Sequence, residues 1–116
     1  MAVYVPAQIV NRMADPQWLA PRWNELSRQL MVDKVYLETY CGRVSVEEET
    51  MRRVKRFFEE RRIGTAGGIT YTSRGGDHFH TLCYSRSDDR RLVREQAERT
   101  ARLFDEVILD DFTFTN

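Results

Sequence analysis

The chain has 116 residues, of which 41% are hydrophobic and 31% charged, a composition typical of a folded globular domain and not of a disordered chain. Its 18 basic and 18 acidic residues give a formal net charge of zero, so we expect no nucleic-acid partner. No apolar run approaches the roughly 20 residues that a membrane helix requires. No signal peptide is visible either, so we expect no membrane partner and leave the localisation open.

The first half of the chain predicts two strands with a helix between them. Residues 2–5 are small, β-branched and aromatic, and Pro6 ends this strand. Asp15 and Pro16 form an N-cap followed by proline at the first helical position. The helix continues as a one-sided apolar stripe of Leu19, Trp23, Leu26 and Leu30. Residues 34–40 then form an apolar strand typical of a sheet covered on both faces.

The second half repeats this alternation. Ser45 and Glu48 match a capping box that opens a second helix, whose buried stripe is Met51, Val54 and Phe58. Residues 63–72 predict a third strand, and a third helix begins near Ser87. Its apolar stripe is Val93, Ala97, Ala101 and Phe104. Residues 106–114 predict the fourth strand, and we expect residues 73–86 to form a long polar loop.

This alternation indicates an α/β fold with a parallel sheet in the order β-α-β-α-β-α-β. We expect sequential strand order with all helices on one face, which is half of a (β/α)8 TIM-type barrel. A complete barrel needs roughly 250 residues. We therefore interpret residues 1–116 as a single partial domain, the N-terminal half of a longer catalytic barrel. The open sheet edge would favour self-association.

Carboxylates fall where parallel α/β folds gather their catalytic groups, at the carboxyl ends of strands. Glu38 lies near the end of the second predicted strand, and Asp110 and Asp111 near the end of the fourth. Glycoside hydrolysis requires two such groups, one to donate a proton and one to act as nucleophile or base. Because side chains alternate along a strand, only one of the two aspartates can face the same cleft as Glu38, and we favour Asp110.

Other residues are candidates for substrate binding. Aromatic rings offer platforms for sugar rings, and glycines in a strand mark a bulge or a close approach of ligand or backbone. An alternative for the aromatics is a place in the core or barrel wall. The candidates for substrate binding are Tyr40, Gly67, Gly68, Tyr71, His78 and Phe112.

The sequence also holds an H-x-H pattern, His78 and His80, whose alternate histidines could share one metal ion. A third ligand is not evident beyond Asp77 or a distant acid. We therefore predict no metal and no cofactor, and we expect these histidines to face solvent or substrate.

Residues 3–8, 34–40, 65–70 and 108–112 together resemble the first half of a poorly characterised group of bacterial TIM-barrel proteins described as candidate glycoside hydrolases. The resemblance implies a carbohydrate-active barrel. A looser similarity links the Gly67–Gly68 and Asp110–Asp111 pairs to chitinase-like barrels. The chain lacks their D-x-x-D-x-D-x-E pattern, however, so no chitinase mechanism is carried over.

The leading hypothesis is therefore a fragment of a glycoside hydrolase with carbohydrate as its partner. We expect the isolated fragment to show little or no hydrolysis, because barrel catalysts draw their groups from several strand ends. One alternative is a metal-dependent hydrolase on the same fold that uses His78, His80 and the aspartates. The other is a non-catalytic half-barrel that self-associates and binds sugar.

Overall fold

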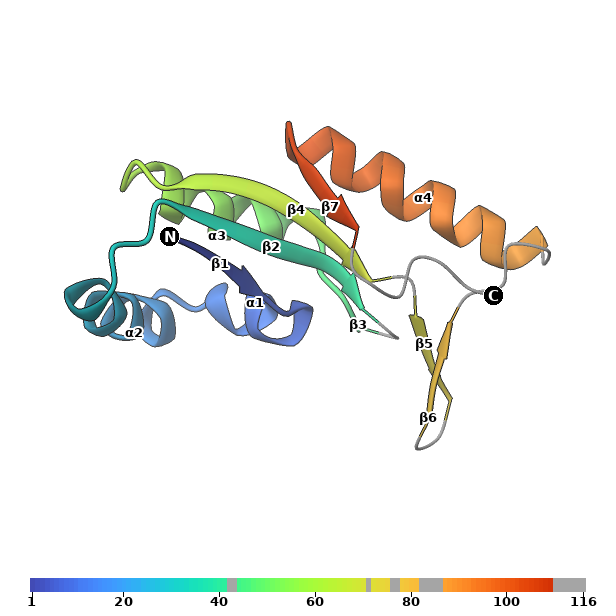
Figure 1. Cartoon of the computed structure of the whole chain (residues 1–116), viewed down its shortest axis with the longest axis horizontal. Coiled ribbons are helices and arrows are strands. Elements are labelled where there is room, and N and C mark those ends of the chain that lie inside the picture. Colours follow the sequence, from blue (N-terminus) through green and yellow to red (C-terminus); the bar gives the residue numbers. More distant parts are fainter. Residues whose placement is uncertain (42–43, 71, 76–77, 82–86, 110–116) are drawn as a thin grey trace.

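The fold, seen in a computed structural model, is an α/β arrangement in which four parallel strands lie side by side (Figure 1). The structure describes residues 1–41, 44–70, 72–75, 78–81 and 87–109. The parallel strands follow one another in sequence order, as predicted: β1 (Ala2–Val5), β2 (Lys34–Cys41), β4 (Gly64–Thr70) and β7 (Val107–Leu109). Each connection between parallel neighbours therefore crosses over through helix, which is the pattern of repeated βαβ units.

Four helices form these connections. They are α1 (Ala7–Met13), α2 (Pro16–Gln29), α3 (Glu48–Glu59) and α4 (Ser87–Leu103). The predicted start of α2 is confirmed, because the Asp15 carboxylate accepts a hydrogen bond of 3.0 Å from the backbone N–H of Gln17. The short helix α1 was not predicted. It follows Pro6 directly and buries only Ala7 and Val10, too few residues to display an apolar period.

The predicted capping box at Ser45 is wrong. Ser45 lies in a two-residue strand, β3 (Val44–Ser45), which pairs antiparallel with the end of β2. Helix α3 begins three residues later, at Glu48, with Glu47 as its N-cap and no side-chain capping bond. The pairing of Ser45 with Tyr40 of β2 holds Ser45 in extended backbone, and this pairing overrides the capping signal.

The segment after β4 is also more ordered than the predicted long loop. Two strands, β5 (Thr72–Gly75) and β6 (His78–Thr81), pair antiparallel in a hairpin that extends away from the main sheet (Figure 1). His78 and His80 therefore lie on a strand and not in a loop. Glycine and polar residues concealed this hairpin, because they show no alternation of apolar and polar side chains.

The two faces of the sheet differ in what covers them. Strand side chains at Val5, Val35 and Leu37 pack into the principal core, which lies between the sheet and the helices. The helices supply further large buried side chains of this core, and Phe104 adds one directly after α4. The helical residues are Val10, Leu19, Trp23, Met51, Val54, Phe58 and Leu103. Side chains of the opposite parity, such as Tyr36 and Ile108, therefore lie on the other face, and Ile108 is 40% exposed. We call this second face the open face.

Helix α4 packs closely on β4 at Gly67. A Cβ atom added at Gly67 would collide with the Thr100 side chain and lie 2.8 Å from Phe104 Cδ2. Any larger residue there would hold α4 away from the sheet, so Gly67 allows the contact between helix and strand.

On the open face, an ion pair joins β2 to the start of β7 across β4. Lys34 Nζ donates to Glu106 Oε2, and the Tyr36 hydroxyl lies 3.4 Å from Glu106 Oε1. The hydrogen bond from Lys34 lowers the pKa of Glu106 and raises the pKa of Lys34. The side chains that β4 contributes between these strands are small, Gly64 and Ala66, so the long side chains meet above them.

This pair predicts how stability depends on pH. The ordinary pKa of a glutamate carboxyl is 4.5, and the pKa of Glu106 in the folded state is lower. Its ionised carboxylate therefore stabilises the fold at pH values above 4.5, and this contribution is lost as the pH falls through the folded-state pKa. Glu106→Gln should therefore unfold more easily than the wild type at pH 7, and the difference should shrink by pH 3. Urea unfolding at both pH values measures this. The exposed Glu95→Gln serves as control, and a Glu106 difference that stays constant with pH would contradict the assignment.

Candidate functional site

The carboxylate of Glu38 is the centre of a polar cluster near the carboxyl ends of β1, β2 and β4. Glu38 is only 3% exposed, yet both of its oxygens have donors. Oε2 accepts from the Tyr4 hydroxyl on β1 and, at 2.8 Å, from the Thr70 hydroxyl on β4. Oε1 accepts from the backbone N–H of Ala7 at 3.0 Å, where α1 begins. A buried carboxylate is tolerated only with such partners, and here three other elements supply donors to one side chain of β2.

The register of the sheet explains this convergence. Tyr4 pairs with Tyr36, and Glu38 pairs with Gly68, so Tyr4 and Glu38 share the open face. Gly68 has no side chain to separate them. A Cβ atom there would lie 2.8 Å from Tyr4 Cε2 and 2.9 Å from the Tyr4 hydroxyl oxygen. Gly68 therefore makes room for the tyrosine that binds Glu38.

A β-bulge follows Glu38 directly. Glu38 pairs with Gly68, but the next pair is Tyr40 with Ile69, so Thr39 is the extra residue of β2. Thr39 is fully buried, and its hydroxyl lies 2.7 Å from the Thr100 hydroxyl of α4 and 3.3 Å from the Gly68 carbonyl oxygen. The bulge thus ends the regular alternation of β2 at the residue beside the carboxylate.

Two predicted binding residues lie on the helix side of the sheet. Tyr40 is 7% exposed and packs with Ile69 and with Leu92 and Val93 of α4, because the bulge moves it to that side. Gly67 meets α4 directly. The structure therefore brings Gly68 to Glu38 and places Tyr40 and Gly67 in the packing between the sheet and α4.

The remaining predicted site residues are placed in part or lie outside the described residues. His78 stands in β6 opposite Gly75. Asp110, Asp111, Phe112 and Tyr71 lie outside the described residues, so their role at the site stays a prediction.

Three partners of Glu38 were not anticipated: Tyr4, Thr70 and the amide of Ala7. All of them are separated from Glu38 by more than 30 positions along the chain, so local patterns cannot reveal the contacts. A signal was present for two of them. Tyr4 and Thr70 are polar-tipped residues near the carboxyl ends of predicted strands, where side chains of neighbouring strands gather.

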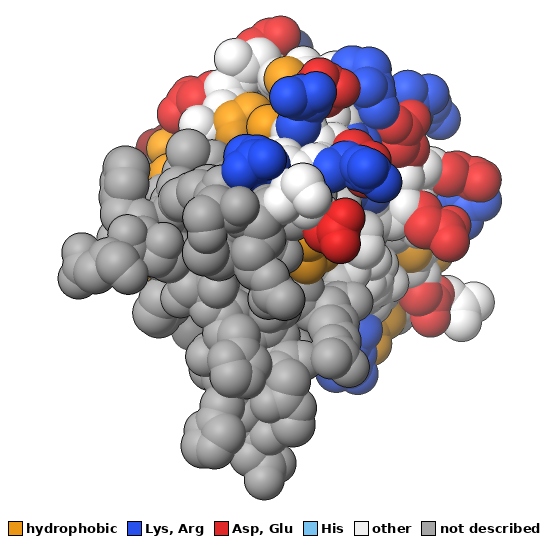
Figure 2. All heavy atoms as spheres, turned by 90° about the vertical axis from the view of Figure 1, so that its right-hand side faces the viewer, with side chains coloured by type: hydrophobic (Ala, Val, Ile, Leu, Met, Phe, Trp, Pro, Cys, Tyr) orange, Lys and Arg blue, Asp and Glu red, His pale blue; other side chains and the backbone are white. Residues whose placement is uncertain are grey.

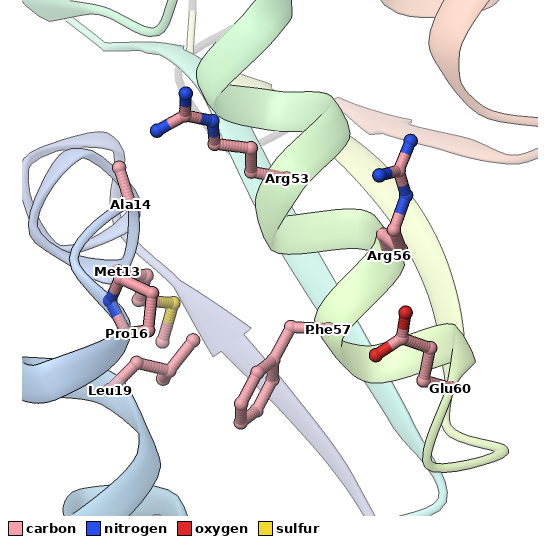
Figure 3. A pocket seen from close by; sticks show the side chains of 8 residues that line it. All are labelled: Met13, Ala14, Pro16, Leu19, Arg53, Arg56, Phe57 and Glu60. Atoms are coloured by element: carbon pink, nitrogen blue, oxygen red, sulfur yellow. The ribbon is translucent and has the colours of Figure 1, made fainter.

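A separate hollow of about 310 Å³ lies in the helix layer, between the α1–α2 junction and α3 (Figure 3). Its wall combines apolar side chains with two arginines and a glutamate: Met13, Ala14, Pro16, Leu19, Arg53, Arg56, Phe57 and Glu60. Because it lies on the opposite side of the sheet from the open face, it is distinct from the cluster around Glu38.

The surface charge, the possible metal ligands and the hydropathy of the helices add three findings. Acidic and basic side chains interleave on the face shown in Figure 2, in agreement with the zero net charge. Among the residues that the structure describes, no group of three or more His, Cys, Asp or Glu side chains is placed to hold a metal ion. Within the same described ranges, no helix has the length and apolar character needed to cross a membrane.

Comparison with known proteins gives one family. The model of the family described as "Probable glycosyl hydrolase, catalytic domain" matches residues 1–116. The chain is also 31% identical over 119 residues to the uncharacterized protein SSO3021 of Saccharolobus solfataricus. That alignment covers 97% of this chain but 20% of the relative, so the chain spans about a fifth of its length. This relative is archaeal, whereas the sequence resemblance was to bacterial proteins. No solved structure matches the chain significantly.

Proposed function

The chain belongs to the family of probable glycosyl hydrolase catalytic domains, and from this premise we propose that it contributes Glu38 as one of two carboxylates that hydrolyse a glycosidic bond. The observation that carries the proposal is the set of three donors converging on a nearly buried carboxylate at the strand ends. Parallel α/β enzymes build their sites at this edge of the sheet.

The surroundings of Glu38 favour the role of nucleophile or base. All three contacts donate hydrogen bonds to the carboxylate, so they stabilise negative charge on it and fix its orientation. A carboxylate that attacks a sugar carbon or activates water must be ionised and oriented before reaction. Proton donation to the leaving oxygen is then the task of a second acid.

We assign that second acid to Asp110, with Asp111 as the alternative. Ile108 pairs with Gly68, which in turn pairs with Glu38, so Ile108 and Glu38 lie on the same face of the sheet. Asp110 follows Ile108 by two positions in the sequence, and residues two apart along an extended strand share a face. This parity supports Asp110 over Asp111.

We further propose that the sheet is part of a (β/α)8 barrel and that the open face lines its interior. Sequential parallel strands with helices packed on one face support this architecture. Contacts between next-but-one strands support it as well. Lys34 of β2 meets Glu106 beside β7, and Tyr4 of β1 closes over Gly68 of β4. Strands two apart are separated by about 9.6 Å in a flat sheet, so concave curvature favours such contacts.

Glu38→Gln tests the catalytic proposal. Glutamine has nearly the shape of glutamate, and its amide can accept from Ala7 while the neighbouring hydroxyls turn to receive its N–H, so the fold should persist. Its loss of charge should reduce kcat roughly a hundredfold or more, the size of effect typical of removing an acid–base group. The measurement is hydrolysis of a panel of aryl glycosides by the complete gene product.

Glu49→Gln is the matched control, because Glu49 is an exposed glutamate of α3 that pairs with Arg53 at the surface. It should hydrolyse each glycoside at the wild-type rate. If Glu38→Gln were folded and equally active, Glu38 would be a structural carboxylate and the proposal would fail.

A further inference from the structure

Helix α4 holds the bulge beside Glu38 through a partly buried cation, Arg99. One guanidinium nitrogen, Nη1, donates to the Val46 carbonyl oxygen at 2.6 Å. The other, Nη2, donates to the Thr39 carbonyl oxygen at 3.0 Å and to Gln96 Oε1 at 2.8 Å. Arg99 therefore binds the backbone of β2 at the bulged residue and the backbone just beyond β3.

The bulge creates the need for this contact. An extra residue in one strand leaves its backbone groups out of the regular ladder, and buried backbone groups require other partners. The Thr39 carbonyl oxygen accepts from Arg99 and also, at 3.0 Å, from the backbone N–H of Val46. The adjacent Thr39 and Thr100 hydroxyls, 2.7 Å apart, provide a second connection between the bulge and α4.

Holding Arg99 in this place is costly for the fold. Burial lowers the pKa of Arg99, an effect that the charge of Glu48 opposes. Its Nε atom is buried and has no hydrogen-bond partner among the described residues. A cation that served only to join α4 to the sheet could be replaced by an apolar side chain with little loss. Arg99 instead donates hydrogen bonds to two backbone carbonyl groups, that of Thr39 in the bulge and that of Val46 beside it.

We infer that Arg99 is a positioning residue for Glu38, acting through the Thr39 bulge. Thr39 follows Glu38 directly, and the Thr39 carbonyl that Arg99 binds lies in the next peptide unit along β2, so this contact helps to fix the backbone beside the Glu38 side chain. Fixing the bulge keeps the carboxylate within reach of Tyr4, Thr70 and the Ala7 amide. The inference rests on the proposed catalytic role of Glu38, but its structural consequence is measurable without activity.

The experiment compares Arg99→Met and Arg99→Lys with Arg102→Met. Arg102 lies on the same helix, and its side chain is 62% exposed and pairs with Glu48 at the surface. Amide hydrogen exchange reports on the cluster through Ala7, whose N–H donates to Glu38, and on the whole fold through Met51, in α3. Arg99→Met should lower protection of Ala7 about tenfold more than that of Met51. Arg99→Lys should restore part of it, and Arg102→Met should leave both amides unchanged.

Activity of the complete gene product gives the second readout. Arg99→Met should reduce kcat about tenfold at unchanged KM. A misplaced carboxylate stabilises the transition state less well, while substrate binding stays the same. Equal loss of protection at Ala7 and Met51 would overturn the inference, since it would mean general destabilisation. If Glu38→Gln proved active while Arg99→Met still lowered the protection of the Ala7 amide, the catalytic role of Glu38 would fail and the positioning role of Arg99 would stand.

Discussion

Phe58→Ala should lower the free energy of unfolding by about 3–5 kcal/mol, the cost of a large cavity in a packed core. The Phe58 side chain is fully buried between the sheet and α2. Its ring meets the rings of Trp23 and Phe57 edge-on, with centroids 5.0 and 5.3 Å apart. Removing it deletes both aromatic contacts and leaves a space that neighbouring rigid side chains cannot fill. Urea unfolding followed by circular dichroism measures the loss.

The neighbouring Phe57 is the matched control, because it is the same residue type on the same helix but only partly buried. It lines the hollow in the helix layer, and the guanidinium of Arg61 stacks 3.6 Å from its ring centroid. Phe57→Ala should cost about half as much or less, since part of its ring already faces solvent and an exposed cation–π contact contributes only about 0.5–1 kcal/mol. Equal losses for the two variants would mean that the core is not centred on Phe58.

Gly67→Ala should destabilise the chain by about 1–3 kcal/mol, although it adds a single methyl group. The new carbon would overlap the Thr100 side chain and approach Phe104 within van der Waals distance, so α4 must move outwards. Because Thr100 also contacts the Thr39 bulge, this movement should loosen the Glu38 cluster as well. Urea unfolding and the hydrogen exchange of Ala7 together detect both effects.

Gly64→Ala on the same strand separates this collision from a general effect of replacing glycine. A Cβ atom at Gly64 would meet the Asp33 carbonyl oxygen at 3.5 Å and the Lys34 side chain at 3.6 Å, which are ordinary contacts. It should leave stability within about 0.5–1 kcal/mol of the wild type, or raise it slightly by stiffening the unfolded chain. A loss of unfolding free energy as large as that of Gly67→Ala would indicate that replacing any glycine of β4 is destabilising.

Much of the architecture was predictable because its signals are local and periodic. The stripe of Met51, Val54 and Phe58 identifies a helix face that is buried. The predicted stripe of α2 is buried at Leu19 and Trp23, but its last member, Leu30, lies after the helix and is 37% exposed. The parallel strands follow from apolar runs separated by these helices. The failures are segments whose conformation depends on strand pairing and not on an apolar period, such as β3, where the pairing of Ser45 with Tyr40 overrides a capping signal.

Only two residues of the candidate site, Glu38 and Gly68, were singled out from the sequence. Glu38 stands out as an acid within an apolar strand. The expected alternation of side chains between the two faces of the sheet is observed from the start of that strand as far as Glu38. The bulge at Thr39 then shifts the following residue, so Tyr40 faces α4 although its even number matches the face of Glu38. An insertion of this kind leaves no trace in the alternation of side chains. The hydroxyl and the carbonyl oxygen of Thr39 in the bulge form hydrogen bonds with Thr100 and Arg99 of α4, some 60 residues further along the chain.

The small residues of β4 have a consequence for how this sequence can evolve. Gly64, Ala66 and Gly68 carry almost no side-chain volume, so space is left over the open face of β4. Side chains from the strands on both sides fill that space. Tyr4 occupies it at one end, and the pair of Lys34 and Glu106 spans it at the other. Growth of Gly68 would therefore be limited by Tyr4 on a different strand, whereas Gly64 has room for a methyl group. We expect natural variants to change Gly68 only together with a compensating reduction of the side chain at Tyr4.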